Sequence, residues 1–379
     1  MLETAAFRFF GDVFLSVYGL MNAKRTKIKS WRWLFLPAFA VFTFLVTELA
    51  ARSPEFVEKY YTQGIYPAIA TFLSFLSNLF PFSLGDLFYG FLILLPVVLI
   101  LLAVIKRISW KFALKFGLNI LALVYISFYF LWGFNYYRSD LNRRLGISEQ
   151  KPDTENFIRV FENLVEQVNA SRTDFETITK TEIDSLVEVS FEKWAPVLKL
   201  HYPSGRRRAK QISLSRFFAQ AGISGYYGPF FNEVHLNRYN LPLEYPFVLA
   251  HEKAHQFGVT SEAEANFYAW VICSQSNSEH LQYSANLAIL RYFLYQGSRL
   301  EELPQIIAKL DEEVKVDLRK IQEHWLELRN EKIDYAATKV NDTYLKTNKI
   351  EQGVRDYTGV VKHVMDFSTD SLFQSTINF

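Results

Sequence analysis

Residues 245–266 read YPFVLAHEKAHQFGVTSEAEAN, and the interpretation of the rest of the chain depends on this stretch. Pro246 suits the first turn of a helix and Gly258 suits its left-handed stop, so the residues between them predict one helix of about three turns. His251 and His255 then share a face of this helix, one turn apart. Two imidazoles so placed can hold one tetrahedral zinc ion.

Glu252 completes a His-Glu-x-x-His string and is placed to act as a general base on a water molecule at the metal. The bare string would occur by chance in roughly one chain per hundred of this composition. Its surroundings favour a real zinc site, because an apolar run at 247–250 precedes it and a carboxylate-containing helix follows it. Whether the metal serves catalysis or only structure stays open at this point.

The third ligand must come from the next predicted helix, where Glu262 and Glu264 lie on opposite sides. Ser261 is a good N-cap and makes a capping box with Glu264, which gives Glu264 a structural task. Glu262 is therefore favoured over Glu264 as the metal ligand. Asn266, one turn after Glu262, is expected to hold a ligand histidine from behind.

Composition limits the classes of protein to which the chain can belong. At 379 residues, with 50% hydrophobic and 17% aromatic residues, it can bury a soluble core and still supply membrane helices. The 41 basic and 39 acidic residues nearly balance, which argues against nucleic acid as a partner. Its one cysteine, Cys273, excludes an internal disulfide and a finger-type zinc site, and is expected to be a small buried residue.

Apolar runs in the first third predict a membrane region at 31–137. Spans long enough to cross a hydrocarbon layer of roughly 30 Å are expected at about 33–51, 87–105 and 116–137. A further uncharged stretch at 64–85 contains serines, an asparagine and two prolines, so it is expected to lie at the membrane interface instead of crossing it.

Basic residues predict the orientation, because cytoplasmic flanks are enriched in lysine and arginine. One basic cluster precedes the first span and another separates the last two, and three spans place both clusters on one side. Residues 1–30 are therefore expected in the cytoplasm, with Met21 as an alternative start, and residues 138–379 outside it. A further basic group at 206–210 is expected to be a solvated loop.

The second half of the chain has the 3.6-residue period of amphipathic helices. Glycines at 222, 225 and 228 lead into an alternating segment at 233–237, which predicts a short strand or hairpin. Its residues Glu233, His235 and Asn237 are candidates for binding an extended substrate along a strand edge. Long helices are expected at 246–257, 262–275, 279–296 and 301–350.

At the His-Glu-x-x-His string and the following Glu-x-x-Ala-Asn pattern, the chain resembles the gluzincin type of zincin metallopeptidases. Nearly the whole chain is also similar to the bacterial membrane proteins of domain-of-unknown-function family 3810. That similarity rests on WGFNYYR at 132–138, GYYGPFFNEVHLN at 225–237, HEKAHQFG with EAEAN, Tyr283-Ser284, and YLK at 344–346. Lys253 departs from the family pattern, which has an apolar residue there.

The resemblance implies a peptidase of the bacterial inner membrane that faces the periplasm. The expected fold is mainly α, with a three-helix membrane region followed by a zincin-like α+β, mostly helical domain at 138–379. The expected partners are the lipid bilayer and a protein or peptide substrate, with zinc as cofactor. Two alternatives remain: a membrane scaffold with a structural zinc, and a zinc amidase acting on the cell envelope.

In the peptidase hypothesis, Glu252 takes a proton from water while the metal and a neighbouring donor stabilise the oxyanion. Tyr283 is the preferred donor, and Tyr226, Tyr227 and His235 are the other candidates. For each of them singly, a packing role is the simpler interpretation.

Overall fold

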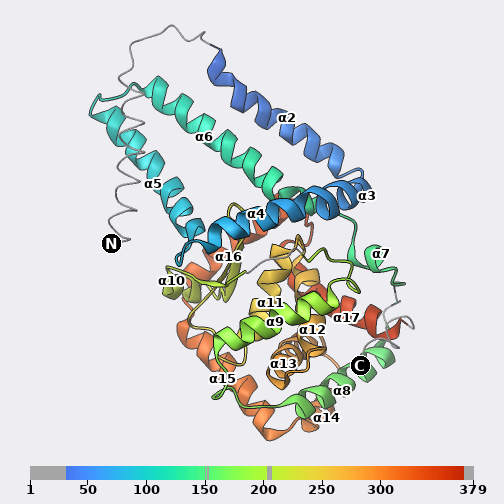
Figure 1. Ribbon diagram of the computed structural model, residues 1–379. Helices are drawn as coiled ribbons and strands as arrows, with labels where there is room; N and C mark the ends of the chain where they lie inside the picture. The colour runs from blue at the N-terminus through green and yellow to red at the C-terminus, as the bar shows by residue number, and fades with distance from the viewer. Residues whose placement is uncertain (1–30, 150, 152, 203–206, 371–379) are drawn as a thin grey trace. The chain divides into compact units, whose positions relative to one another are not determined.

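The computed structural model describes residues 31–149, 151, 153–202 and 207–370 (Figure 1). Within these residues the chain forms two compact units. The smaller unit consists of residues 31–43 and Leu99–Ile126, and the larger unit consists of Phe44–Val98 together with the chain from Ser127 onward. The predicted N-terminal segment 1–30, with the question of Met1 or Met21 as the start, lies outside the described residues.

Three helices of the described chain are long and apolar enough to cross a membrane. They are α2 (Phe35–Ala50, preceded by the 3-10 turn η1 at Arg32–Leu34), α5 (Leu84–Val104) and α6 (Trp110–Leu131). At most 17% of any of these hydrophobic windows is buried inside the protein, as expected for surfaces that face lipid. The prediction of three membrane-length apolar helices is confirmed.

The third of these helices has different bounds from those expected. It begins at Trp110, so two lysines that had been expected to precede it lie in its first turns. It ends at Leu131, and residues 133–137 form the separate 3-10 turn η3 (Gly133–Tyr137), which is buried throughout. Gly133 allows this turn, because a Cβ there would lie 2.7 Å from the Phe128 ring. The chain thus leaves the span directly into the core of the larger unit.

The larger unit is mainly helical. Beyond parts of α2, α5 and α6, its helical elements are α3 (Pro54–Phe56), the π-helical η2 (Val57–Ile65), α4 (Tyr66–Asn78), η3, α7 (Leu141–Leu145), α8 (Thr154–Ser171), α9 (Lys180–Trp194), α10 (Ser215–Gln220), α11 (Tyr245–Gln256), α12 (Glu262–Ser274), α13 (Glu279–Gln296), α14 (Leu303–Ala308), α15 (Glu312–Leu328), α16 (Glu331–Thr347), η4 (Gly353–Gly359) and α17 (Val360–Thr369).

Capping residues explain where several helices begin. Thr179 and Glu182 form a capping box at the start of α9. The single helix expected at 301–350 is instead α14, α15 and α16. Asp311 and Asn330 interrupt it with extended backbone, and the Asn330 side chain accepts hydrogen bonds from the first backbone N–H groups of α16.

A three-stranded sheet with the order β1-β3-β2 lies beside the helices. It consists of β1 (Lys210–Gln211), β2 (Gly225–Gly228) and β3 (Glu233–Leu236). β3 pairs parallel with β1 and antiparallel with β2, and Tyr226 stands opposite His235 in the register. The strand and hairpin predicted around 233–237 are therefore present, with β3 in the middle of the sheet.

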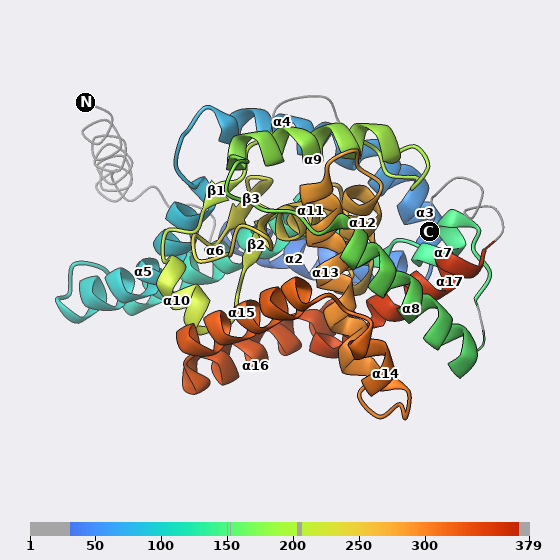
Figure 2. The ribbon, with the colours of Figure 1, turned by 90° about the horizontal axis from the view of Figure 1, so that it is seen from below.

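The core of the larger unit surrounds α11, α12 and α13, which occupy its middle, with α4 and α9 on one side and α15 and α16 on the other (Figure 2). α12 is buried on every side from Ala263 to Cys273, and α8 covers α13 with an apolar stripe that includes Val160, Phe161 and Leu164. Cys273 is buried, as expected. Residues 44–98 belong to this compact unit together with the chain from Ser127 onward.

Candidate metal centre

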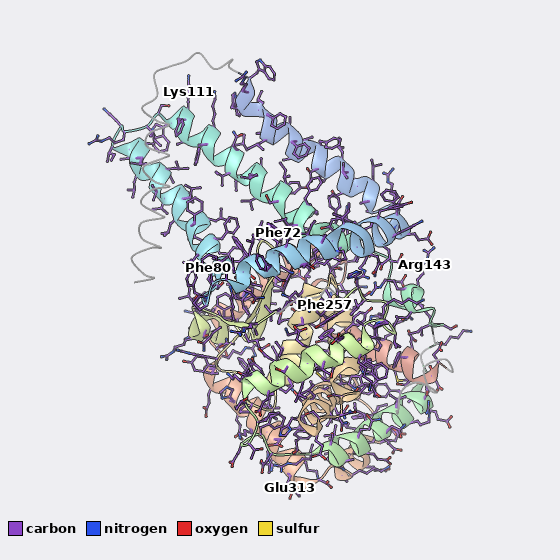
Figure 3. All side chains as sticks on the ribbon, viewed as in Figure 1. Phe72, Phe80, Lys111, Arg143, Phe257 and Glu313 are labelled. Atoms are coloured by element: carbon purple, nitrogen blue, oxygen red, sulfur yellow. The ribbon has the colours of Figure 1, made fainter. Side chains whose placement is uncertain are left out.

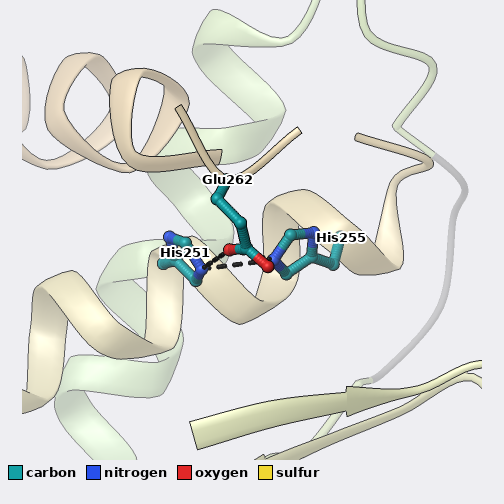
Figure 4. Close-up of side chains that lie close together, drawn as sticks. All are labelled: His251, His255 and Glu262. Carbon is teal, nitrogen blue, oxygen red and sulfur yellow. Dashed lines mark hydrogen bonds and ion pairs between the residues drawn. The ribbon is translucent and has the colours of Figure 1, made fainter. Parts of the chain in front are cut away.

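Helix α11 carries both histidines of the sequence motif. Pro246 occupies its first turn, where the missing N–H has no cost, and Gly258 just beyond its end has a left-handed φ of 85°. The helix is buried at almost every position and packs against α12, α13, α9 and the sheet. His251 and His255 project from the face that meets the start of α12 (Figure 4).

Glu262 is the first residue of α12, and its position depends on how that helix begins. The Ser261 side chain caps the helix by accepting from the backbone N–H of Glu264. Asp356, from η4, accepts hydrogen bonds from the Ser261 hydroxyl at 2.8 Å, the Glu262 N–H at 2.7 Å and the Ala263 N–H at 3.3 Å. The backbone of the candidate ligand is thus held from a segment almost a hundred residues away in the sequence.

The three side chains meet with the spacing of a tetrahedral metal site (Figure 4). Nε2 of His251 lies 3.1 Å from Oε2 of Glu262 and 3.1 Å from Nε2 of His255. Nε2 of His255 lies 3.3 Å from Oε2 of Glu262, so the three atoms form a triangle. Ligand atoms around a zinc ion with bonds of roughly 2.0–2.1 Å lie roughly 3.3 Å apart. The donor set of two imidazoles and one carboxylate also suits zinc, so these residues fit the ion.

The imidazole of His255 is oriented for a metal by its other nitrogen. Its Nδ1 lies 2.7 Å from the carbonyl oxygen of Val259, which can only accept, so Nδ1 carries the proton and Nε2 faces the group. The indole N–H of Trp132 donates to the His255 carbonyl at 2.9 Å. Nδ1 of His251 is buried and has no hydrogen-bond partner among the described residues.

The electrostatics of the group favour positive charge at its centre. Burial alone raises the pKa of Glu262, but the charge of His255 and hydrogen bonds from both histidines outweigh it and lower that pKa well below 4.5. Burial lowers the pKa of His255, and the charge of Glu262 outweighs it and raises this pKa to about 9. His251 and His255 are buried and the Glu262 side chain is only 12% exposed, so solvent screens these interactions weakly.

Glu252 lies beside the group, under strand β2. It is buried, and burial raises its pKa, an effect partly offset by the charges of His251 and His255. Gly225 of β2 approaches it so closely that a Cβ there would lie 2.7 Å from Oε1 of Glu252 and 3.0 Å from the His235 carbonyl. Only glycine fits at this point of β2 without displacing Glu252.

The comparison with family models follows this geometry. The family described as protein of unknown function (DUF3810) matches residues 61–365, a range that runs from η2 into α17 and contains the whole His251, His255 and Glu262 group. The chain belongs to the DUF3810 family. No curated protein and no solved structure matches the sequence.

In this DUF3810 protein the competing carboxylate, Glu264, is directed away from the metal group. It pairs with the buried guanidinium of Arg144, with 2.6 Å between Oε2 and Nη2, and the same guanidinium contacts the Tyr268 hydroxyl. The preference for Glu262 agrees with the three-residue group that the structure brings together. Ser261 caps the helix as expected, but the carboxylate of Glu264 binds Arg144.

Asn266 was expected to hold a ligand histidine, because it lies one turn after Glu262. In the structure it has other partners. Its amide donates to the Tyr292 hydroxyl at 3.1 Å and to the Tyr357 carbonyl at 3.4 Å. The Val259 carbonyl orients His255 instead. A backbone carbonyl in the turn after α11 leaves no signal in residue types, which is why the sequence pointed to the nearest amide side chain.

The structure does not bring the expected oxyanion donor Tyr283 to the group. Tyr283 is fully buried on α13, where it donates to Asp317 at 2.6 Å and its ring contacts Phe175. Tyr226 donates to Asp86 and stacks on His235, while Tyr227 donates to Asn232 at 2.7 Å. Each of these hydroxyls is used in packing.

Tyr357 in η4 is the tyrosine that sequence reasoning missed. Burial raises its pKa well above 10, and the charge of Glu262 acts in the same direction. Its hydroxyl therefore stays protonated beside the group. Its only sequence signal is its position next to Asp356, and nothing in the sequence showed that η4 meets α12.

Strand β3 does not offer the free edge expected at 233–237, because it has β1 on one side and β2 on the other. Glu233, His235 and Asn237 are all buried. Glu233 accepts from Lys210, from Ser83 and from the first N–H groups of α5. Burial raises the pKa of Glu233, but a hydrogen bond with His235 and the bonds from Lys210 and Gly85 outweigh burial and lower this pKa to about 2. Glu233 and His235 thus attach the start of α5, and Asn237 donates to the carbonyls of Ser215 and Ile223 in the segment that contains α10.

Proposed function

We propose that this protein is a membrane-anchored, zinc-dependent peptidase that hydrolyses peptide bonds of extracytoplasmic or membrane-proximal proteins. The carrying observation is the triangle of Nε2, Nε2 and Oε2 atoms with sides of 3.1, 3.1 and 3.3 Å. A carboxylate, Glu252, directly follows the first histidine of that triangle. A set of metal ligands beside a buried carboxylate is the arrangement that metal-assisted hydrolysis requires.

His251, His255 and Glu262 would hold the zinc ion. Bound zinc supplies a Lewis acid that polarises a carbonyl oxygen and makes water more acidic. Glu252 takes the proton of the attacking water onto its carboxylate and then passes it to the leaving amine nitrogen. The Val259 carbonyl keeps the proton of His255 on Nδ1 throughout. Tyr357, beside Glu262, replaces Tyr283 as the candidate hydroxyl donor to the developing oxyanion.

We assign the binding of an extended substrate to β2 instead of β3. β2 is an outer strand of the sheet, and its Gly225 lies against Glu252. A peptide that adds to the outer edge of β2 through backbone hydrogen bonds passes next to Glu252. The aromatic neighbours in β2, Tyr226 and Tyr227, are partly buried and border that edge.

The proposed location is the bacterial inner membrane, with the larger unit facing the periplasm. Three membrane-length helices support a membrane protein. The basic residues before α2 and between α5 and α6 support their placement on the cytoplasmic side.

A structural zinc in a non-catalytic scaffold is the second candidate. It is favoured by the burial of both histidines and by the bonds that Asp356 makes across η4 and α12, since such a site braces two elements. A zinc amidase acting on envelope substrates would use the same residues on a different bond, and a substrate-trapping experiment with the Glu252→Gln protein separates it from a peptidase.

The test is Glu252→Gln in purified full-length protein loaded with zinc, with cleavage of a quenched fluorescent peptide library as the readout. We expect a rate at least about 100-fold lower than that of the parent, because a general base contributes about that much. Zinc content, measured by elemental analysis, should stay near about one ion per chain.

Glu244→Gln is the matched control, since Glu244 lies at the other end of α11 and accepts from Trp325. It should leave the rate unchanged. Equal cleavage by the parent and Glu252→Gln, or parent protein without zinc, contradicts the proposal. If the parent binds zinc but cleaves no peptide, and the His255→Ala protein is unfolded, the scaffold with a structural zinc is the correct function.

A further inference from the structure

Helix α4, with Ile65 just before it and Leu79 just after it, carries an exposed face of apolar residues. Ile65, Ala68, Phe72, Phe75 and Leu79 follow one another at helical spacing, and Phe72 and Phe75 are 60% and 63% exposed. Phe80, Pro81 and Phe82 continue the exposed apolar surface beyond its end. Figure 3 shows Phe72 on α4 and Phe80 just after it. No charged residue occurs from Tyr60 to Gly85.

The opposite face of α4 is more polar and is buried. Tyr66 donates to the Gln256 carbonyl at 2.7 Å, the Ser74 hydroxyl accepts from Asn232 at 2.8 Å, and the Ser77 carbonyl accepts from Lys210 at 2.8 Å. A helix between a protein core and water shows the reverse pattern, with apolar residues inside and polar ones outside. The medium on the outer side of α4 is therefore apolar.

A protein partner would also be apolar, but the chain around α4 favours lipid. In the sequence, α4 lies between two membrane-length helices, since α2 ends at Ala50 and α5 begins at Leu84. The exposed residues Phe80 and Phe82 lead from its outer face to α5, whose 18-residue hydrophobic window is only 6% buried, as expected for a helix in lipid. With 13 residues, α4 is about 20 Å long and cannot cross a layer of about 30 Å.

We infer that α4 lies in the surface of the bilayer, with its outer face among lipid chains and its inner face bonded to the metal-centre helix. Removing the large apolar side chains of that face from water favours membrane attachment. A shallow surface groove of about 800 Å³ beside Phe72 and Phe75 offers space for an acyl chain. The inference goes beyond the proposed function, because it holds whether or not the centre binds zinc.

This arrangement places the candidate metal centre at the membrane boundary. Tyr66 of α4 holds the carbonyl of Gln256, the residue next to His255. Asn232 adds a second link, since its amide donates to the Ala70 carbonyl and its own carbonyl accepts from Gln256 at 2.7 Å. Trp132, the first residue after the membrane-length helix α6, donates its indole N–H to the His255 carbonyl. The end of α11 is thus held by residues of, or adjoining, two lipid-contacting helices.

The test measures the surroundings of a spin label on α4 in full-length protein reconstituted into phosphatidylglycerol–phosphatidylethanolamine vesicles. Single Phe72→Cys and Phe75→Cys proteins are labelled, and the accessibility of each label to oxygen and to a water-soluble nickel chelate is compared. Cys273 is buried, and the labelled parent supplies the background. Two controls match Phe75 in exposure: Leu121→Cys on α6 (68%) and Tyr335→Cys on α16 (70%).

We expect the α4 labels to resemble the Leu121 label, with an oxygen-to-nickel ratio severalfold above that of the Tyr335 label, because oxygen concentrates in hydrocarbon and the chelate in water. A ratio equal to that of Tyr335 shows water at this face and overturns the inference. Labels that neither reagent reaches show a protein partner or a second copy and overturn it as well. None of these readings depends on zinc or on cleavage, so they are independent of the proposed function.

Discussion

Lys253 shows how a charged side chain is accommodated inside the metal-centre helix. It is fully buried, and its ammonium donates to Glu188 of α9 at 2.6 Å and to the Arg207 carbonyl at 3.0 Å. Burial raises the pKa of Glu188, but the charges of Lys253 and Arg207 outweigh it and lower that pKa below 4.5. The family resemblance anticipated an apolar residue here, and the acidic partner on α9 explains how the lysine fits.

We expect Lys253→Met to destabilise the protein by about 3–5 kcal/mol, because it leaves Glu188 buried with less compensation. Thermal and chemical unfolding of the detergent-purified protein measure the change. Lys309→Met is the matched control: its partner is Glu162, the pair is half exposed, and the loss should stay below about 1 kcal/mol. Similar losses for both variants would refute the role of the buried pair.

At the scale of elements, the start of α12 is assembled from two distant segments. Ser261 caps the helix locally, while Asp356 of η4 accepts from the N–H groups of Glu262 and Ala263. A carboxylate at a helix N-terminus is also favoured by the helix dipole. Because Glu262 is itself the first residue of α12, η4 controls where the candidate ligand points.

Asp356→Ala should therefore lower stability by about 1–2 kcal/mol and weaken zinc affinity by about 10–100-fold. Competition with a chromogenic zinc chelator measures the affinity, and thermal unfolding measures the stability. Asp311→Ala is the control, because Asp311 also stands at an N-cap but its side chain makes no capping bond. Unchanged zinc affinity in Asp356→Ala would show that η4 does not position the candidate ligand Glu262.

For the protein as a whole, residues far before α6 in the sequence belong to the same compact unit as the candidate metal group. Residues 44–98 and the chain from 127 onward form one compact unit. Buried polar groups bind across this sequence gap: Lys210 to the carbonyls of Ser77 and Phe82, and Arg138 to Glu58. Polar groups buried in this way are costly to leave without partners.

A fragment of residues 138–379, the domain expected from the sequence, should consequently fail to fold. Each buried group that loses its partner costs about 1–3 kcal/mol, and several such losses together are comparable with a typical stability of about 5–15 kcal/mol. A fragment of residues 51–379 keeps these partners and should unfold cooperatively in detergent. Near-ultraviolet circular dichroism during heating distinguishes the two, and a cooperative transition in 138–379 would disprove the dependence.

The sequence alone determined the features that depend on neighbours along the chain. The spacing of His251 and His255, the stop at Gly258 and the cap at Ser261 are local, and the membrane-length helices follow from runs of apolar residues. The capping box expected for Glu264 was wrong in one half, because its N–H is capped by Ser261 but its carboxylate binds Arg144. Such features are set by helix geometry and hydropathy, which a few adjacent residues specify.

Only the tertiary structure decided which distant groups meet. Asp356 and Tyr357 reach the metal group from η4, Gly225 lies against Glu252, and β3 is enclosed between two strands. The sequence also does not show which face of α4 is buried. The hydrogen bond from Tyr66 to the Gln256 carbonyl identifies the more polar face as the inner one. These contacts join residues tens to hundreds of positions apart, and their energies come from packing and burial that no local pattern encodes.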